Sequence, residues 1–191
     1  MKSKTRCSWC GTEPLYVEYH DTEWGVPLRD EQELFEFLVL ETFQAGLSWI
    51  TVLRKRENFR KVFDNFDYKK IALYDEEKIA ELLQDAGIIR NKLKVRATIS
   101  NAVAFIKIQK EFDSFSKYIW EFVNDLPIQN NIKSMSEIKA TTETSDKLSK
   151  DLKERGFKFV GPTVIYAHMQ ATGMVNDHAI DCFRNKEVQT V

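Results

Sequence analysis

The chain has 191 residues, 43% of them hydrophobic, which is enough for a substantial core in one large domain or two small lobes. Its formal net charge of −1 excludes a polycation, so any nucleic acid must be bound by a local basic face. No apolar run is long enough to span a membrane, no signal peptide opens the chain, and three cysteines argue against a disulfide framework, so we expect a cytoplasmic protein without membrane contact.

The segment from residue 14 to 27 is rich in aromatic side chains. Tyr16, Tyr19 and Trp24 lie between two prolines, and their poor periodicity predicts a loop with short helical turns. Aromatic residues in such a segment either pack as a satellite core or present flat faces to a planar base. The segment alone leaves both interpretations open.

A clear helix signal begins at Asp30, where the pattern DEQE resembles a capping box and predicts a helix over residues 34–43. Glu41 falls at the end of this helix, where an acidic side chain opposes the helix dipole. It is therefore either an exposed surface residue or one that another interaction holds in place.

Gly46 interrupts the helical pattern, and Ser48 can cap a second helix predicted over residues 49–63. The basic residues of this helix predict a solvated face: Arg54, Lys55, Arg56 and Arg60.

The middle of the chain also has helical periodicity. One long helix ending near Phe112 should bury Val95, Ile99, Val103 and Ile106. The polar segment over about 126–144 predicts a connection between two helical lobes. No run alternates as a strand, so the prediction is an all-α domain spanning residues 1–191, with further helices over 76–86, 115–123 and 145–155.

A short turn joins two helices near the C-terminus. Gly156 ends one helix, Pro162 can open the next, and only residues 157–161 remain between them. Free backbone N–H groups and the positive end of the helix dipole suit a phosphate oxygen, with Lys158 adding charge. An ordinary corner between two helices is the alternative.

Cysteine and histidine residues gather at the two ends of the chain. His178 and Cys182 are one helical turn apart, which suits a single metal ion. Two N-terminal ligands would close a tetrahedral zinc site and tie the chain ends together. The spacing Cys7-x2-Cys10 favours those two residues, and His20 is a further candidate.

The segments YHDTEWGVP, QAGLSWITVLRKRENFR and GFKFVG, followed by VNDH, resemble the 3-methyladenine DNA glycosylase I family of the helix-hairpin-helix superfamily. The resemblance runs from Cys7 to about Cys182. It implies a helix-hairpin-helix architecture with two helical lobes, and one structural zinc bound by Cys7, His20, His178 and Cys182, which leaves Cys10 in reserve.

The resemblance also implies an activity, which is the hydrolytic excision of 3-methyladenine from double-stranded DNA by a monomer that releases the free base. It assigns Glu41 to the base edge and Trp49, Tyr16, Tyr19, Trp24 and Trp9 to the base pocket. It places Gly46 and Leu47 at the gap left by the flipped base, and the hairpin residues Lys158, Val160 and Gly161 on the DNA.

Two features depart from the family pattern or leave alternatives. Many hairpin glycosylases carry a catalytic Asp at the position that aligns here with Asn176, and Thr42 and Phe43 are bulkier than expected near the pocket. A methylated adenine is already a good leaving group, so positioning can replace a strong base. The alternatives are a DNA-binding module without catalysis and a glycosylase for another alkylated base.

Overall fold

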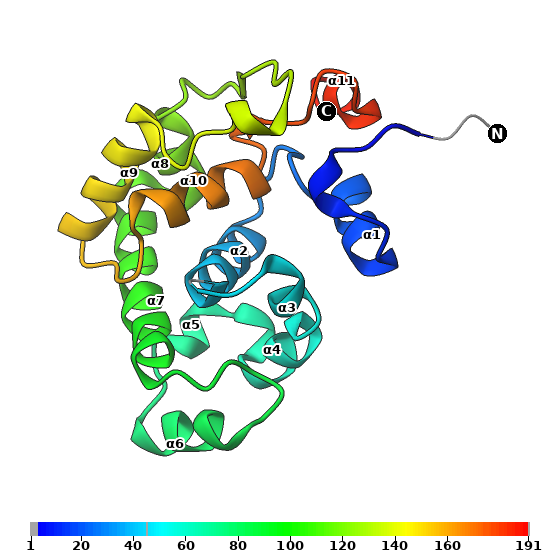
Figure 1. Cartoon of the computed structure of the whole chain (residues 1–191). Helices are drawn as coiled ribbons and strands as arrows, with labels where there is room; N and C mark the ends of the chain where they lie inside the picture. The colour runs from blue at the N-terminus through cyan, green and yellow to red at the C-terminus, as the bar shows by residue number, and fades with distance from the viewer. Residues whose placement is uncertain (1–3, 45, 191) are drawn as a thin grey trace.

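The computed structural model describes residues 4–44 and 46–190, and it confirms the prediction of a mostly helical chain (Figure 1). Within those ranges, a parallel pair of two-residue strands departs from the all-α expectation. In chain order the elements are η1 Ser8–Cys10, α1 Pro14–Thr22, α2 Glu31–Gln44, α3 Trp49–Leu53, α4 Arg56–Val62, η2 Asp64–Phe66, α5 Tyr68–Ile71, α6 Glu76–Gln84, α7 Lys92–Phe112, α8 Phe115–Glu121, β1 Ile128–Gln129, η3 Met135–Glu137, α9 Glu143–Glu154, α10 Pro162–Ala171, β2 Val175–Asn176 and α11 Phe183–Glu187.

Helix α2 lies at the centre of the molecule and packs against α3, α7, α8 and α10 (Figure 1). Asp30 caps it, since one carboxylate oxygen accepts from the backbone N–H groups of Gln32 and Glu33, both at 2.9 Å. Every residue from 34 to 43 is buried. A helix that is apolar on most of its circumference belongs in the interior, so the polar residues near its C-terminus are carried inside with it.

The predicted helix over residues 49–63 is two helices, α3 and α4, so that prediction is wrong at residues 54 and 55. The predicted solvated face is also wrong for Arg56, which is 8% exposed. Its guanidinium donates to Glu36 on α2 and to Glu23 after α1, and Arg60 also donates to Glu36 at 2.8 Å. These ion pairs connect α4 to α2, so both arginine side chains are engaged in contacts within the protein.

Helix α7 buries only part of the predicted face. Val95 is buried as expected, but Val103 is 38% exposed, and Ala102 and Phe105 are buried in addition. The ring of Phe105 stacks on Phe115 of α8 with 4.1 Å between centroids. The buried stripe includes small and polar side chains, which a count of large apolar residues does not detect.

The two ends of the chain meet at one side of the molecule (Figure 1). The backbone N–H of Phe183 donates to the carbonyl of Thr5 at 3.0 Å. Residues 126–144 contain β1 and η3, and β1 pairs with β2 in the register Ile128 with Val175. Their role as a connection between two lobes stays a prediction. Among the described helices, none is both long and apolar enough to cross a membrane.

Candidate active site

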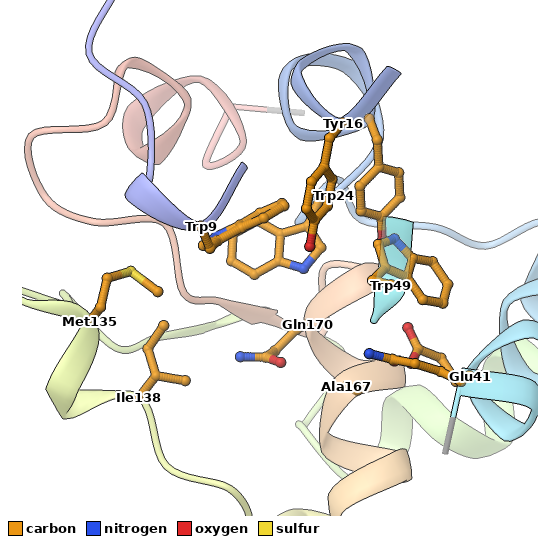
Figure 2. A pocket seen from close by; sticks show the side chains of 11 residues that line it. Trp9, Tyr16, Trp24, Glu41, Trp49, Met135, Ile138, Ala167 and Gln170 are labelled. Atoms are coloured by element: carbon orange, nitrogen blue, oxygen red, sulfur yellow. The ribbon is translucent and has the colours of Figure 1, made fainter. Parts of the chain in front are cut away.

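A cavity of about 230 Å³ lies between α1, the C-terminal end of α2, α10 and the segment around η3 (Figure 2). Aromatic side chains form one wall, and a carboxylate and two amides lie among the other lining residues. The lining residues are Trp9, Tyr16, Tyr19, Trp24, Glu41, Gln44, Trp49, Met135, Ile138, Ala167 and Gln170.

All five aromatic residues expected at the base pocket line this cavity. Residues 14–22 of the segment expected to be a loop with short helical turns form a nine-residue helix, α1, because Pro14 occupies its first turn rather than breaking it. Tyr16 and Tyr19 are therefore three residues apart on one helix and lie near each other. The indole of Trp9 meets Tyr16 at 5.0 Å and Trp24 at 4.8 Å between ring centroids.

Glu41 projects into the cavity from the last turn of α2 (Figure 2). It is 4% exposed, and its Oε2 has no hydrogen-bond partner among the described residues. Burial raises the pKa of this carboxyl group to about 8. The surface alternative is therefore excluded, and the group is a buried acid whose charge nothing nearby in the described chain compensates.

Two indole N–H groups, Trp9 Nε1 and Trp49 Nε1, are also buried without a hydrogen-bond partner in the part of the chain that the structure describes. Buried polar groups in folded proteins nearly always have partners. All three atoms belong to side chains that line one cavity, which indicates a site that is completed by a polar ligand.

The residues expected at the DNA gap border a second, adjoining hollow of about 240 Å³. Gly46 has a φ of +84°, which favours glycine, and Leu47 is among the exposed large apolar residues. Glu41 lines both hollows, and Thr163 of α10 lines the second. Gly46 and Leu47 thus lie between the cavity and the start of α10.

The hairpin between α9 and α10 is held by hydrogen bonds from a side chain of α7. The side chain of Asn101 bonds both backbone groups of Lys158, accepting from its N–H at 2.8 Å and donating to its carbonyl at 3.1 Å. Val160 is buried, whereas the side chain of Lys158 is exposed. At Gly161 an added Cβ would meet no atom within 4 Å, so the space in front of α10 is open.

Cys7, His20, His178 and Cys182 come together as a buried cluster whose ligand atoms all lie within 4.8 Å of one another. Cys10 is also buried, but its sulfur contacts the carbonyl of Cys7 instead of this cluster. The cluster therefore matches the set implied by the family resemblance. A hydrogen bond from Cys7 lowers the pKa of the Cys182 thiol, as the bonds to the two imidazoles also do.

Each imidazole of the cluster is oriented from its outer nitrogen. His178 Nε2 is 2.9 Å from the carbonyl of Trp24, which can only accept. His20 Nδ1 is 2.8 Å from the carboxylate of Asp21, which Arg6 holds in turn. These bonds direct the lone pairs of the inner nitrogens into the cluster, where His20 Nε2 also accepts from the backbone N–H of Cys7 at 3.4 Å. An outer hydrogen bond on each imidazole is the arrangement of metal-bound histidines.

The cluster also fixes the aromatic wall of the cavity. Cys7 immediately precedes η1, which carries Trp9, and His20 lies on α1 beside Tyr19. The carbonyl of Trp24 accepts from His178, as described above. The same segments of the chain thus carry both the cluster and the aromatic wall of the pocket.

Five lining residues were not predicted at the pocket from the sequence, namely Gln44, Met135, Ile138, Ala167 and Gln170. Met135 and Ile138 come from the polar segment after β1, where nothing local signals a pocket. Gln170 is a polar residue of α10, but that helix also contains Thr163 and His168. Residue type therefore did not mark it as part of a pocket.

Three residues of doubtful role at the sequence level lie outside the cavity lining. Asn176 is buried, and its amide bonds Gln129 at 2.7 Å and the backbone of Asn185 at 3.0 Å. Thr42 bonds within its own helix, and Phe43 packs on Phe59 with 4.8 Å between centroids. Their bulk fills the core rather than the pocket.

Comparison with known proteins identifies close relatives. The sequence pattern of the family described as methyladenine glycosylase matches residues 9–185. DNA-3-methyladenine glycosylase 1 of Escherichia coli is 51% identical over 177 residues, which cover 93% of this chain and 95% of the relative. DNA-3-methyladenine glycosylase of Haemophilus influenzae is 48% identical over 178 residues, with coverage of 93% and 96%.

Solved structures agree with these relatives. A crystal structure of 3-methyladenine DNA glycosylase I superposes with a TM-score of 0.91 at 50% identity, covering 94% of this chain and 98% of that one. A 3-methyladenine DNA glycosylase I from Staphylococcus aureus, solved to explain its recognition of 3-methyladenine, gives a TM-score of 0.92 at 36% identity, with coverage of 94% and 96%.

Proposed function

The chain belongs to the methyladenine glycosylase family, and we propose that it hydrolyses the bond between 3-methyladenine and deoxyribose in alkylated DNA. The observation that carries this proposal is the unpartnered Oε2 of Glu41 inside an aromatic cavity. A module that only gripped phosphates would need neither a buried carboxylate nor a cage of rings.

The cavity suits a positively charged base. Adenine methylated at N3 is a cation while it is bonded to deoxyribose, and the faces of Trp9, Tyr16 and Trp49 attract cations more strongly once water is excluded. The carboxylate of Glu41 accepts a hydrogen bond from the exocyclic amine and balances the charge. Tyr19 and Trp24 complete the cage.

The chemistry requires little proton transfer. Cleavage leaves the base neutral, so the leaving group needs no acid, and water adds to the sugar carbon and releases a proton to solvent. Positioning of the base in the cavity supplies most of the acceleration. The use of Asn176 in the core, where other hairpin glycosylases carry a catalytic Asp, is consistent with this mechanism.

Two surfaces are assigned to DNA. Gly46 and Leu47 fill the space left by the flipped nucleotide, because they border the hollow that adjoins the cavity. Gly161 lets a phosphate approach the first N–H groups of α10, and Lys158 adds charge beside it. Val160 anchors the hairpin in the core.

The buried cluster holds one structural zinc in this proposal. Two thiolates and two imidazoles are a common ligand set for zinc, and four protein ligands leave no position for a reactive water. The outer hydrogen bonds of His20 and His178 fit such a role. Zinc would fix the aromatic wall and join the chain ends.

The test is single-turnover release of 3-methyladenine from methylated DNA, comparing wild type with Glu41→Gln. The variant keeps size and one acceptor but loses the charge. A charge-assisted hydrogen bond contributes about 1.5–3 kcal/mol, so the rate should fall by about ten- to a hundredfold. Phe43→Leu, next to a different cluster of rings, is the control for general damage near α2. Absence of base release by the wild-type enzyme would refute the function.

A further inference from the structure

A second buried carboxylate lies behind the wall of the cavity. Asp177 is 1% exposed and accepts three hydrogen bonds from side chains. Tyr166 donates to Oδ2 at 2.7 Å, Gln170 Nε2 donates to the same oxygen at 2.7 Å, and Asn130 donates to Oδ1 at 2.6 Å. All three partners are donors, so the group acts as an acceptor on both oxygens.

This network fixes the orientation of one side-chain amide on the cavity wall, that is, which of its ends faces Asp177. Gln170 projects from α10 and lines the cavity, and Figure 2 shows its side chain below the ring of Trp24, extending toward Ile138. An amide can present either its oxygen or its nitrogen to a ligand. Because Asp177 requires the nitrogen, Oε1 is left for the cavity, and no donor among the described residues bonds it.

We propose that Asp177 is a positioning residue for base selection, which holds Gln170 so that this wall offers an acceptor and no donor. The proposal rests on the excision of 3-methyladenine proposed above. A negative carboxylate behind the amide also polarises it, which strengthens the acceptor at Oε1.

Such an acceptor separates adenine from guanine derivatives. When a cationic base is bound, the ionised carboxylate of Glu41 accepts from a 6-amino group, and Gln170 adds a second acceptor on the cavity wall. A carbonyl fixed at Gln170 can only accept. A purine that brings its own carbonyl oxygen into the cavity therefore meets an unpaired acceptor, and a desolvated pair of acceptors is unfavourable.

The experiment compares single-turnover excision of 3-methyladenine and 3-methylguanine from the same methylated DNA. The two bases carry the methyl group on the same atom and differ at C6, N1 and C2. In Asp177→Asn the new amide can donate or accept, so the Gln170 amide is free to turn over. The ratio of the two rates should fall by about tenfold, the effect of one unpaired buried group.

Gln170→Met removes the amide at similar length, and its rate ratio should fall to the same extent. The double variant should show no further fall, because Asp177 acts through Gln170. Tyr166→Phe is the matched control, since it removes a hydrogen bond to the same oxygen but leaves the Gln170 contact in place. Its ratio should stay within about twofold of wild type, because only the structural part of the network is lost.

The outcomes distinguish the two proposals. An unchanged ratio in Gln170→Met, or in folded Asp177→Asn, overturns the positioning role. Additive effects in the double variant overturn it as well, because they would mean that the two residues act separately. Failure of the wild-type enzyme to release 3-methyladenine would instead refute the proposed function, before any ratio is measured.

Discussion

The unpartnered carboxyl group of Glu41 should make the stability of the protein fall as pH rises. Burial raises its pKa from 4.5 to about 8. Below pH 4.5 the group is protonated in both the folded and the unfolded state, so it has no effect. Between these two values the unfolded chain loses the proton and the folded chain keeps it, so the unfolded state is increasingly favoured.

The size of the effect follows from the shift. Each pH unit in this window contributes about 1.4 kcal/mol, so the free energy of unfolding should fall by on the order of 3 kcal/mol from pH 5 to pH 8 through this residue alone. Glu41→Gln removes the titrating group. The variant should therefore gain stability relative to wild type as pH rises, even though it loses activity.

Urea unfolding at pH 5, 6, 7 and 8 measures this difference, with the slope against urea checked for constancy. Metal binding also depends on pH, but it is common to both proteins and cancels in the difference. Glu36→Gln is the control on the same helix, and it should destabilise because it removes the partner of Arg56 and Arg60. A difference between wild type and Glu41→Gln that stays constant within about 0.5 kcal/mol from pH 5 to pH 8 would refute the argument.

Three further predictions address the metal, the hairpin and the cage. Cys182→Ser should lose the metal and lower the melting temperature, whereas Cys10→Ser should keep one equivalent of zinc by metal analysis; the reverse result would exchange their assignments. Gly161→Asp should weaken DNA binding at least tenfold by repelling phosphate, with unchanged affinity for free 3-methyladenine, and equal loss of both affinities would indicate a damaged fold. Trp49→Ala should weaken binding of the free base by about 1–3 kcal/mol in calorimetry, and wild-type affinity would remove this ring from the cage.

The features that could be predicted from sequence depend on local chemistry. Asp30 and Pro162 mark helix starts because their effect is confined to the neighbouring backbone. The members of the buried cysteine and histidine cluster could be recognised as candidate ligands by residue type, but the spacing of Cys7 and Cys10 favoured a pair of which only Cys7 lies in the cluster. The choice of His20 depends on how α1 packs against the C-terminal loop, and spacing along the chain carries no such information.

The features that could not be predicted depend on contacts across the chain. The break between α3 and α4 accompanies the inward turn of Arg56 to Glu36, twenty residues earlier in sequence. A charged residue in a basic run is normally solvated, so no local pattern identifies this one as buried. Met135 reaches the cavity in the same way, from a polar segment whose position is fixed partly by the pairing of β1 with β2.

Three buried carboxylates show how the molecule divides its charge between folding and recognition. Glu36 is balanced by two arginines, and Asp177 by three neutral donors, so both are compensated within the protein. Glu41 lacks any such partner at Oε2 among the described residues, and its ionisation is therefore unfavourable until a ligand enters. A cationic base brings both a hydrogen-bond donor and a positive charge, which together favour the ionised form. Undamaged adenine brings only the donor, so we infer that the pocket distinguishes damaged from normal bases by charge as well as by shape.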